Sequence, residues 1–218
     1  MATIIVRKPI DVTNRLAELG WSADDLLEVT SAMVRARNGC TPNHPSSAPG
    51  WFAWAEGTSR IREFGLRKGL VREDVDGIPW VVDKKRGIRF TVANTDDGTG
   101  IEGRIPQQRS RKGPSTDRAV DRNQTSIFDF LPEGPVVPLS RVRSHPGIMV
   151  SWYACTYCEG DIVRAELSYP IGMEGGLFVD FAERIFLISG DHDDDLVKRK
   201  GDDGDGGSDF EINVTRRK

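Results

Sequence analysis

Apolar side chains recur at helical spacing in the first third of the chain. The pattern over residues 22–39 predicts an amphipathic helix with one buried stripe. Ser22 is a suitable N-cap for this helix, and Gly39 is suited to a left-handed C-cap. A shorter pattern over residues 11–19 predicts a helix before it.

A third helical pattern covers residues 51–69, after a segment at 39–50 whose prolines and serines predict a loop. Gly57 and Gly65 weaken this helix, because glycine is less favourable than alanine in a helix interior. The hydrophobic pattern of this helix predicts one apolar face, made of Trp51, Trp54, Ala55, Thr58 and Ile61.

Runs rich in β-branched and aromatic residues predict strands in the rest of the chain. Residues 80–83 and 88–93 predict a hairpin, with a short polar turn between them. Four later runs predict an antiparallel sheet, and they cover residues 147–157, 161–170, 176–189 and 209–217. Three helices and a hairpin would also suit a winged helix, but no helix has the charge pattern of a recognition helix.

The middle of the chain loses regular periodicity. Glycine, proline and polar residues dominate it, with one short helix expected after Pro114 in which Ala119 and Val120 face inward. We therefore expect an α+β fold with a helical N-terminal part that includes the hairpin and a C-terminal antiparallel sheet. The expected boundaries are a helical domain at 1–93, a basic linker at 94–138 and a β domain at 139–218.

Composition limits the class of protein. The 218 residues carry a formal charge of −3, which argues against non-specific coating of nucleic acid but leaves room for a local basic patch. No apolar run approaches the roughly 20 residues that span a bilayer, so we expect a cytoplasmic protein without a membrane segment. Three cysteines, an odd number, favour a reducing compartment over a disulfide framework.

A basic stretch in the middle segment is the first candidate site. Its cations, placed among turn residues, predict a contact with phosphate or nucleic acid through Arg104, Arg109, Arg111 and Lys112. A solvated basic loop is the alternative. If Asp96 and Asp97 shared a cleft with these cations, they would be suited to metal binding or to general-base catalysis on a phosphate-bearing substrate.

Two further patterns predict structure rather than chemistry. Gly98, Gly100 and Gly103 have the spacing of a dinucleotide-binding loop, but no helix follows them, so we expect a glycine-rich turn. The pairs Cys40 with His44 and Cys155 with Cys158 would make a zinc set only if distant segments met. Cys155 and Cys158 project to opposite faces of a strand, so we expect structural cysteines, no metal site and no cofactor.

Residues 124–128, QTSIF, resemble the peptide by which many bacterial DNA polymerases and repair proteins dock on the sliding clamp. The resemblance makes Gln124 the polar anchor, and Ile127 with Phe128 the apolar pair that fills a pocket. Thr125 stands where the common form has leucine. The alternative is that these apolar residues hold the middle segment to the protein's own core.

Several stretches, among them NTDDGTGIE, SWYACTYCEGDIVRAELSYP and GGSDFEINVTRRK, resemble a group of bacterial proteins from proteobacterial genomes and mobile elements. The resemblance covers most of the chain from Trp51 onward and implies a bacterial or phage-derived protein, with no activity attached. We therefore expect a non-catalytic binding or accessory protein of bacterial or phage DNA metabolism or mobile-element biology. The alternatives are an enzyme acting on a phosphate-bearing substrate and a self-associating phage or plasmid structural protein, with the oligomeric state open.

Overall fold

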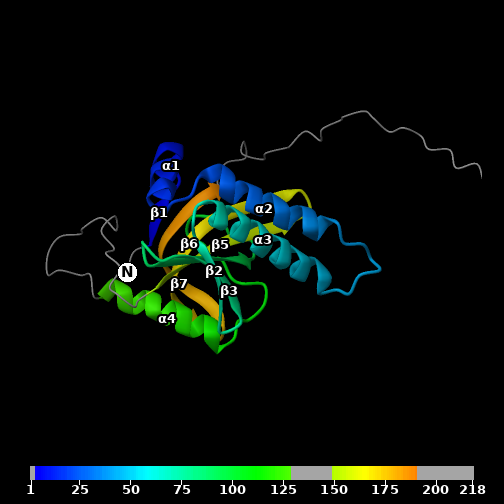
Figure 1. The fold of residues 1–218 in the computed structure, drawn as a ribbon. Helices are drawn as coiled ribbons and strands as arrows, with labels where there is room; N and C mark the ends of the chain where they lie inside the picture. Colours follow the sequence, from blue (N-terminus) through cyan, green and yellow to red (C-terminus); the bar gives the residue numbers. More distant parts are fainter. Residues whose placement is uncertain (1–2, 129–148, 191–218) are drawn as a thin grey trace, which may run out of the picture.

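The computed structural model describes residues 3–128 and 149–190 of the chain. Four helices and seven strands follow one another along these residues (Figure 1). In chain order they are β1 (Ile4–Val6), α1 (Pro9–Glu18), α2 (Ala23–Asn38), α3 (Ala48–Arg67), β2 (Val71–Val75), β3 (Ile78–Asp83), β4 (Ile88–Asn94), α4 (Pro114–Phe128), β5 (Val150–Glu159), β6 (Ile162–Glu174) and β7 (Leu177–Ile188).

All seven strands form one mixed sheet in the order β1-β7-β6-β5-β4-β3-β2. The expected hairpin is present as β3 and β4, and three of the four expected C-terminal strands are β5, β6 and β7, which pair antiparallel. The fourth, at 209–217, lies outside the described residues. The mixture of helix and sheet agrees with an α+β fold, but a separate antiparallel C-terminal sheet is wrong, because β4 and β5 pair in parallel and join the two groups of strands.

The sheet therefore runs across the boundaries at which we expected domains to divide. Helix α4, which lies between β4 and β5 in the sequence, packs across one face of the sheet against β5 and β6. The segment between β4 and α4 also packs on the sheet, since Thr95 pairs with Gln108 in an isolated bridge and the Gly100 amide donates to the Glu166 carboxylate at 2.6 Å.

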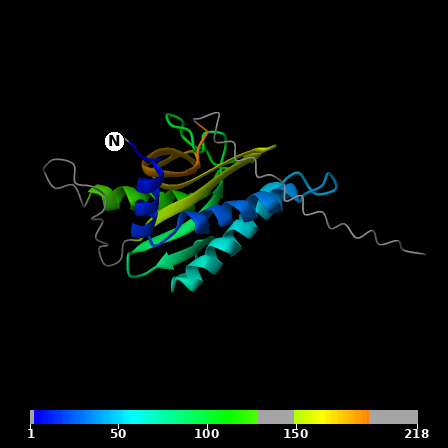
Figure 2. The same ribbon diagram turned by 90° about the horizontal axis from the view of Figure 1, so that it is seen from above.

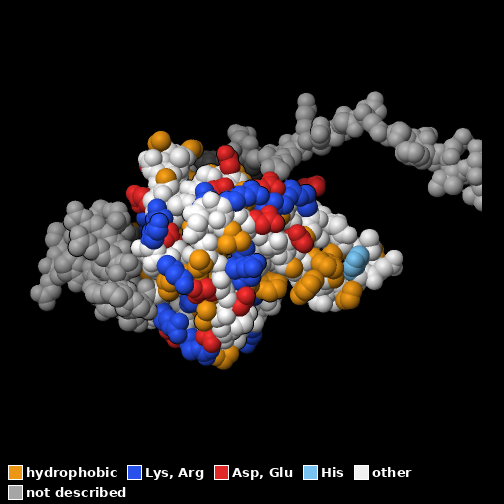
Figure 3. Space-filling model, viewed as in Figure 1, with side chains coloured by type: hydrophobic (Ala, Val, Ile, Leu, Met, Phe, Trp, Pro, Cys, Tyr) orange, Lys and Arg blue, Asp and Glu red, His pale blue; other side chains and the backbone are white. Residues whose placement is uncertain are grey.

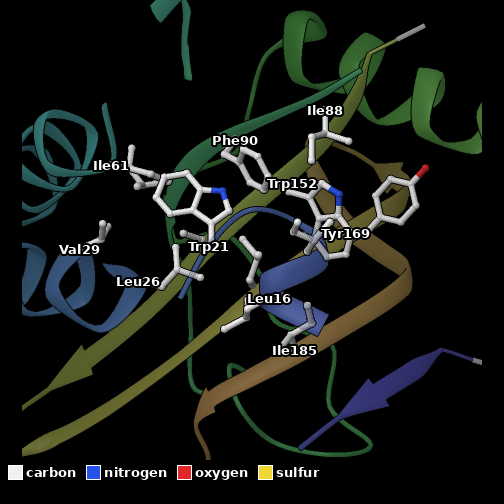
Figure 4. Packing of buried hydrophobic residues seen from close by; sticks show 14 of the residues in the cluster. Leu16, Trp21, Leu26, Val29, Ile61, Ile88, Phe90, Trp152, Tyr169 and Ile185 are labelled. Carbon is white, nitrogen blue, oxygen red and sulfur yellow. The ribbon is translucent and has the colours of Figure 1, made fainter. Parts of the chain in front are cut away.

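Helices cover both faces of the sheet. Helices α1, α2 and α3 lie over one face and α4 over the other, as the two views show (Figures 1 and 2). The first face carries the larger core, in which Trp21 meets Phe90 edge to face and Trp152 stacks on Tyr169 (Figure 4). The second face has a smaller core around Tyr153.

Helix α2 begins as the sequence predicts and ends differently. The Ser22 hydroxyl accepts from the Asp25 amide at 3.2 Å, and the Asp25 carboxylate accepts from the Ser22 amide at 3.1 Å, which completes a capping box. Gly39 closes the helix with a φ of −70°, so the expected left-handed cap is wrong. The glycine is instead close to its own helix, because a Cβ on it would lie 3.3 Å from the Arg35 carbonyl oxygen.

Helix α3 confirms most of its predicted face and begins earlier than predicted. It begins at Ala48, inside the expected loop, because Pro49 is tolerated in the first turn of a helix. Thr58 and Ile61 are buried and Trp54 packs against the larger core, whereas Trp51, near the start of the helix, is 59% exposed. At Gly57 a Cβ would lie only 2.5 Å from the Met33 side chain, so α3 approaches α2 closely at this position.

Helix α4 is longer than the short helix expected after Pro114. Ala119 and Val120 are buried, which confirms the predicted inward face. Asn123 ties the helix to the sheet: its amide nitrogen donates to the Ser151 and Pro170 carbonyls, both at 2.8 Å, and its amide oxygen accepts from the Ser151 amide at 2.7 Å.

Candidate functional site

The carboxyl ends of β4 and β5 lie side by side because the two strands are parallel neighbours. Open sheets that contain parallel strands commonly bind ligands at this edge. Here the strand ends meet the end of α2 and the start of α3 around a shallow hollow that is open to solvent and encloses about 10 Å³. The hollow is lined by Met33, Val34, Arg37, Ala53, Asn94, Arg109, Thr156 and Cys158.

Arg109 is fixed at one side of the hollow. Its amide donates to the Asn94 carbonyl at 3.1 Å, and its Nε and Nη2 atoms donate to the carbonyls of Thr95 and Cys158 at 3.1 and 3.3 Å. Nη2 also lies 3.3 Å from the Glu159 carboxylate, and the guanidinium sits over the Tyr157 ring at 5.3 Å. The cation is thus held in place by backbone atoms and an aromatic face.

Arg37 enters the hollow from the last turn of α2. The carbonyl end of a helix favours a cation at this position. Its guanidinium is half-buried and has no hydrogen-bond or ion-pair partner in the described part of the chain. Asn94, opposite, donates from its amide nitrogen to the Gly50 carbonyl at 2.7 Å and so connects the hollow to the start of α3.

Cys158 forms part of the wall between the two arginines. Burial raises the pKa of its thiol, and the Arg37 and Arg109 cations oppose that rise. Both cations therefore act on the same group. Cys155 lies on the opposite face of β5, in the smaller core, where burial and then the Glu166 charge raise the pKa of its thiol well above the ordinary value.

Exposed aromatic side chains adjoin the hollow at the start of α3. Trp51 and Phe52 are 59% and 36% exposed, with ring centroids 5.2 Å apart, and the His44 ring lies 5.9 Å from Phe52. Figure 3 shows hydrophobic side chains gathered around the connection from α2 to α3, next to the pale-blue histidine. We call Trp51, Phe52 and Arg37 the α2–α3 corner.

The four cations predicted to form a phosphate site do not converge. Arg104 pairs with Asp97 at 2.8 Å, whereas Arg109 reaches the hollow. Arg111 and Lys112 lie beside Gly176 in the turn between β6 and β7, and burial lowers the pKa of Lys112. Only Arg109 of the four is therefore part of the candidate site.

The acidic residues of the enzyme alternative have structural partners. The Asp96 carboxylate accepts from the amides of Gly98 and Gln107 at 3.1 and 2.9 Å and so closes its own loop. Asp97 is engaged by Arg104. Gly98 and Gly100 allow close packing, since a Cβ on Gly100 would lie 2.6 Å from the Ile188 carbonyl oxygen at a φ of +68°.

Residues 124–128 form the last turns of α4, and the backbone there is helical. Gln124 is exposed, while the side chains of Ile127 and Phe128 lie outside the described residues. Docking on a sliding clamp as an extended peptide would require this end of α4 to unwind. The clamp interaction stays a prediction.

The two cysteine pairs considered for a zinc set have other surroundings in the structure. Cys40 contacts the Ala36 carbonyl oxygen at 3.7 Å, and Cys155 and Cys158 project to opposite faces of β5 as predicted. Among the described residues, no three His, Cys, Asp or Glu side chains are grouped as metal ligands.

Comparison with protein families, curated proteins and solved structures finds no match to this chain. The resemblance to bacterial and mobile-element proteins accordingly stays a prediction. Within the described residues, no helix has both the length and the apolar composition that a membrane span requires.

Sequence reasoning missed two members of this site. Arg37 was interpreted only as a cation in the last turn of a helix, and Trp51 as a buried residue. Periodicity gave no signal for Trp51, because it shares a helix stripe with the buried Thr58 seven residues later.

Proposed function

We propose that this protein is a binding protein of bacterial or phage DNA metabolism and that it binds single-stranded DNA at the α2–α3 corner. The observation that carries the proposal is the exposed Trp51 and Phe52 pair beside the unpartnered Arg37. Proteins that hold single strands combine aromatic rings, on which bases stack, with cations that contact the backbone phosphates.

The α2–α3 corner is suited to bind a short stretch of single-stranded DNA rather than to cover a long one. The whole chain has a net charge of −3, so the attraction must come from a few placed cations. Trp51 follows Gly50 directly, and the Gly50 carbonyl is bonded to Asn94 in the wall of the hollow. A base on Trp51 and a phosphate at the hollow would therefore belong to adjacent parts of one strand.

A binding function is favoured over the enzyme alternative because the Asp96 and Asp97 carboxylates are engaged in structural contacts. Asp96 accepts two backbone amides and Asp97 pairs with Arg104, so each carboxylate has a structural role at a distance from the aromatic pair.

The test is fluorescence anisotropy with a labelled oligothymidine titrated with wild-type protein and with Trp51→Ala. We expect the variant to bind about 5- to 150-fold more weakly, which corresponds to the roughly 1–3 kcal/mol of a stacked base. Leu66→Ala is the matched control, since Leu66 is 47% exposed on the same helix but near its other end. Equal affinity of Trp51→Ala and Leu66→Ala, or no binding by the wild type, would overturn the proposal.

A further inference from the structure

Two arginines face one hollow without an acid between them. Arg37 has no partner in the described chain, and Arg109 meets one carboxylate, that of Glu159, whose side chain is 70% exposed. Two neighbouring guanidinium groups repel each other unless an anion lies between them. An oxyanion in the hollow would relieve this repulsion and accept hydrogen bonds from both groups.

The donors at Arg109 are already oriented. Its Nε and Nη2 atoms are occupied by backbone carbonyls, which leaves Nη1 without a partner among the described residues. Because the loop also fixes the backbone through the bridge between Thr95 and Gln108, a bound anion would not need to order this side chain. Arginine is suited to phosphate oxygens because its planar group presents several N–H donors.

The size of the hollow limits what it can hold. Pockets for whole small molecules span about 300–1,000 Å³, whereas the enclosed part of this hollow measures about 10 Å³, room for about one water. Asn94 and Thr156 add polar side chains to its lining. A phosphate group would therefore lie at the open mouth of the hollow, with any attached nucleoside further out, toward Trp51.

We propose that the open mouth of this hollow is an oxyanion site at which Arg37 and Arg109 bind one phosphate group. The inference deepens the proposed function and rests on it only for the source of the phosphate. That source is a DNA backbone if the α2–α3 corner binds DNA, and free phosphate otherwise.

The test measures the thermal unfolding midpoint, Tm, with increasing inorganic phosphate at constant ionic strength. Arg37→Gln is compared with Arg35→Gln, which removes the same charge from the same helix turn at an arginine paired with Glu28 at 2.9 Å. We expect phosphate to raise the Tm of wild type and Arg35→Gln by mass action. In Arg37→Gln the phosphate affinity is expected to fall about tenfold or more.

A second arm repeats the oligothymidine titration with the same two variants. Weaker DNA binding by Arg37→Gln alone, together with its lost phosphate response, supports a DNA phosphate as the ligand. A phosphate response that depends on Arg37, without DNA binding by the wild type, keeps the oxyanion site and overturns the proposed function. Equal phosphate responses in both variants, or none in wild type, overturn the oxyanion site even if DNA binds.

Discussion

The two faces of the sheet are built from different interactions. The face under α1, α2 and α3 is filled mainly by aliphatic and aromatic side chains, with Trp152 and Tyr169 stacked at 5.2 Å. Its buried Glu183 carboxylate is paired at 2.7 Å with Arg15 of α1, a cation at the edge of the core. On the face under α4 both partners of the ion pair are buried, since Glu166 is fully buried and Arg184 is 3% exposed. The first face therefore depends mostly on packing, which tolerates many sequences, and the second more on directed hydrogen bonds, which require particular partners.

The buried pair on the α4 face organises the loop that follows β4. The Glu166 carboxylate accepts from Arg184 Nη2 and from the Gly100 amide, both at 2.6 Å. Arg184 in turn donates to the carbonyls of Gly98 and Arg104 at 3.1 and 2.6 Å. The pair thus replaces, for this loop, the backbone hydrogen bonds that a strand or helix would supply.

Removal of Arg184 should have the largest effect. Arg184→Met leaves the Glu166 carboxylate buried without its cation, and we expect a loss of about 3–5 kcal/mol in the free energy of unfolding. Urea denaturation of wild type and Arg184→Met measures this loss.

The double variant Glu166→Leu with Arg184→Met sharpens this prediction. We expect it to be more stable than Arg184→Met alone, because no isolated charge remains buried. A double variant at least as destabilised as the sum of the two single variants would show that the loop contacts, rather than the buried charge, dominate.

Truncation on the opposite face should have a smaller effect. Leu26 is 1% exposed in the larger core, and Leu26→Ala is expected to lower the free energy of unfolding by about 3 kcal/mol through lost burial and a residual cavity. Leu66→Ala, at a 47% exposed position, should change it by about 0.5 kcal/mol or less in the same urea experiment. Similar losses in both variants would contradict the packing account of this face.

The smallest expected effect is a pH dependence of the free energy of unfolding. It comes from Cys155, which is buried in the smaller core on the α4 face. The pKa of Cys155 is raised above 9.0 by burial and by the Glu166 charge, so the folded state keeps this proton longer than the unfolded chain does. The associated stability is complete below the unfolded pKa and is lost as pH rises above it, by on the order of 1 kcal/mol at pH 10.

Urea denaturation at pH 8 and pH 10 checks this dependence. Cys155→Ala should lose less stability than wild type between the two pH values, by on the order of 1 kcal/mol. Cys40→Ala, at the half-buried cysteine of the α2–α3 connection, should follow wild type. The idea fails if all three proteins lose the same stability.

Local signals in the sequence predicted the local elements well. The capping box at Ser22, the hairpin of β3 and β4, and the inward face of α4 all follow from neighbouring residues. Strands β1 and β2 were not predicted, because each is a short edge strand whose pairing depends on a partner elsewhere in the chain.

The candidate site was predicted only in part. Arg109 was recognised as a cation that could contact phosphate, but its grouping with Arg104, Arg111 and Lys112 was wrong in space, because the loop carries these side chains to different neighbours. Arg37 comes from a helix more than 70 positions earlier in the chain. No spacing rule connects two residues that meet only when α2 packs beside the end of β5.

By itself, the sequence determined where helices and strands form, since capping, turn residues and hydrophobic periodicity act over a few neighbouring positions. Only the tertiary structure decided that β5 pairs with β4 in parallel, that Glu166 meets Arg184 and that Trp51 faces outward beside Arg37. Those outcomes depend on contacts between distant segments, such as the close approach of α3 to α2 at Gly57, where a Cβ would lie 2.5 Å from the Met33 side chain.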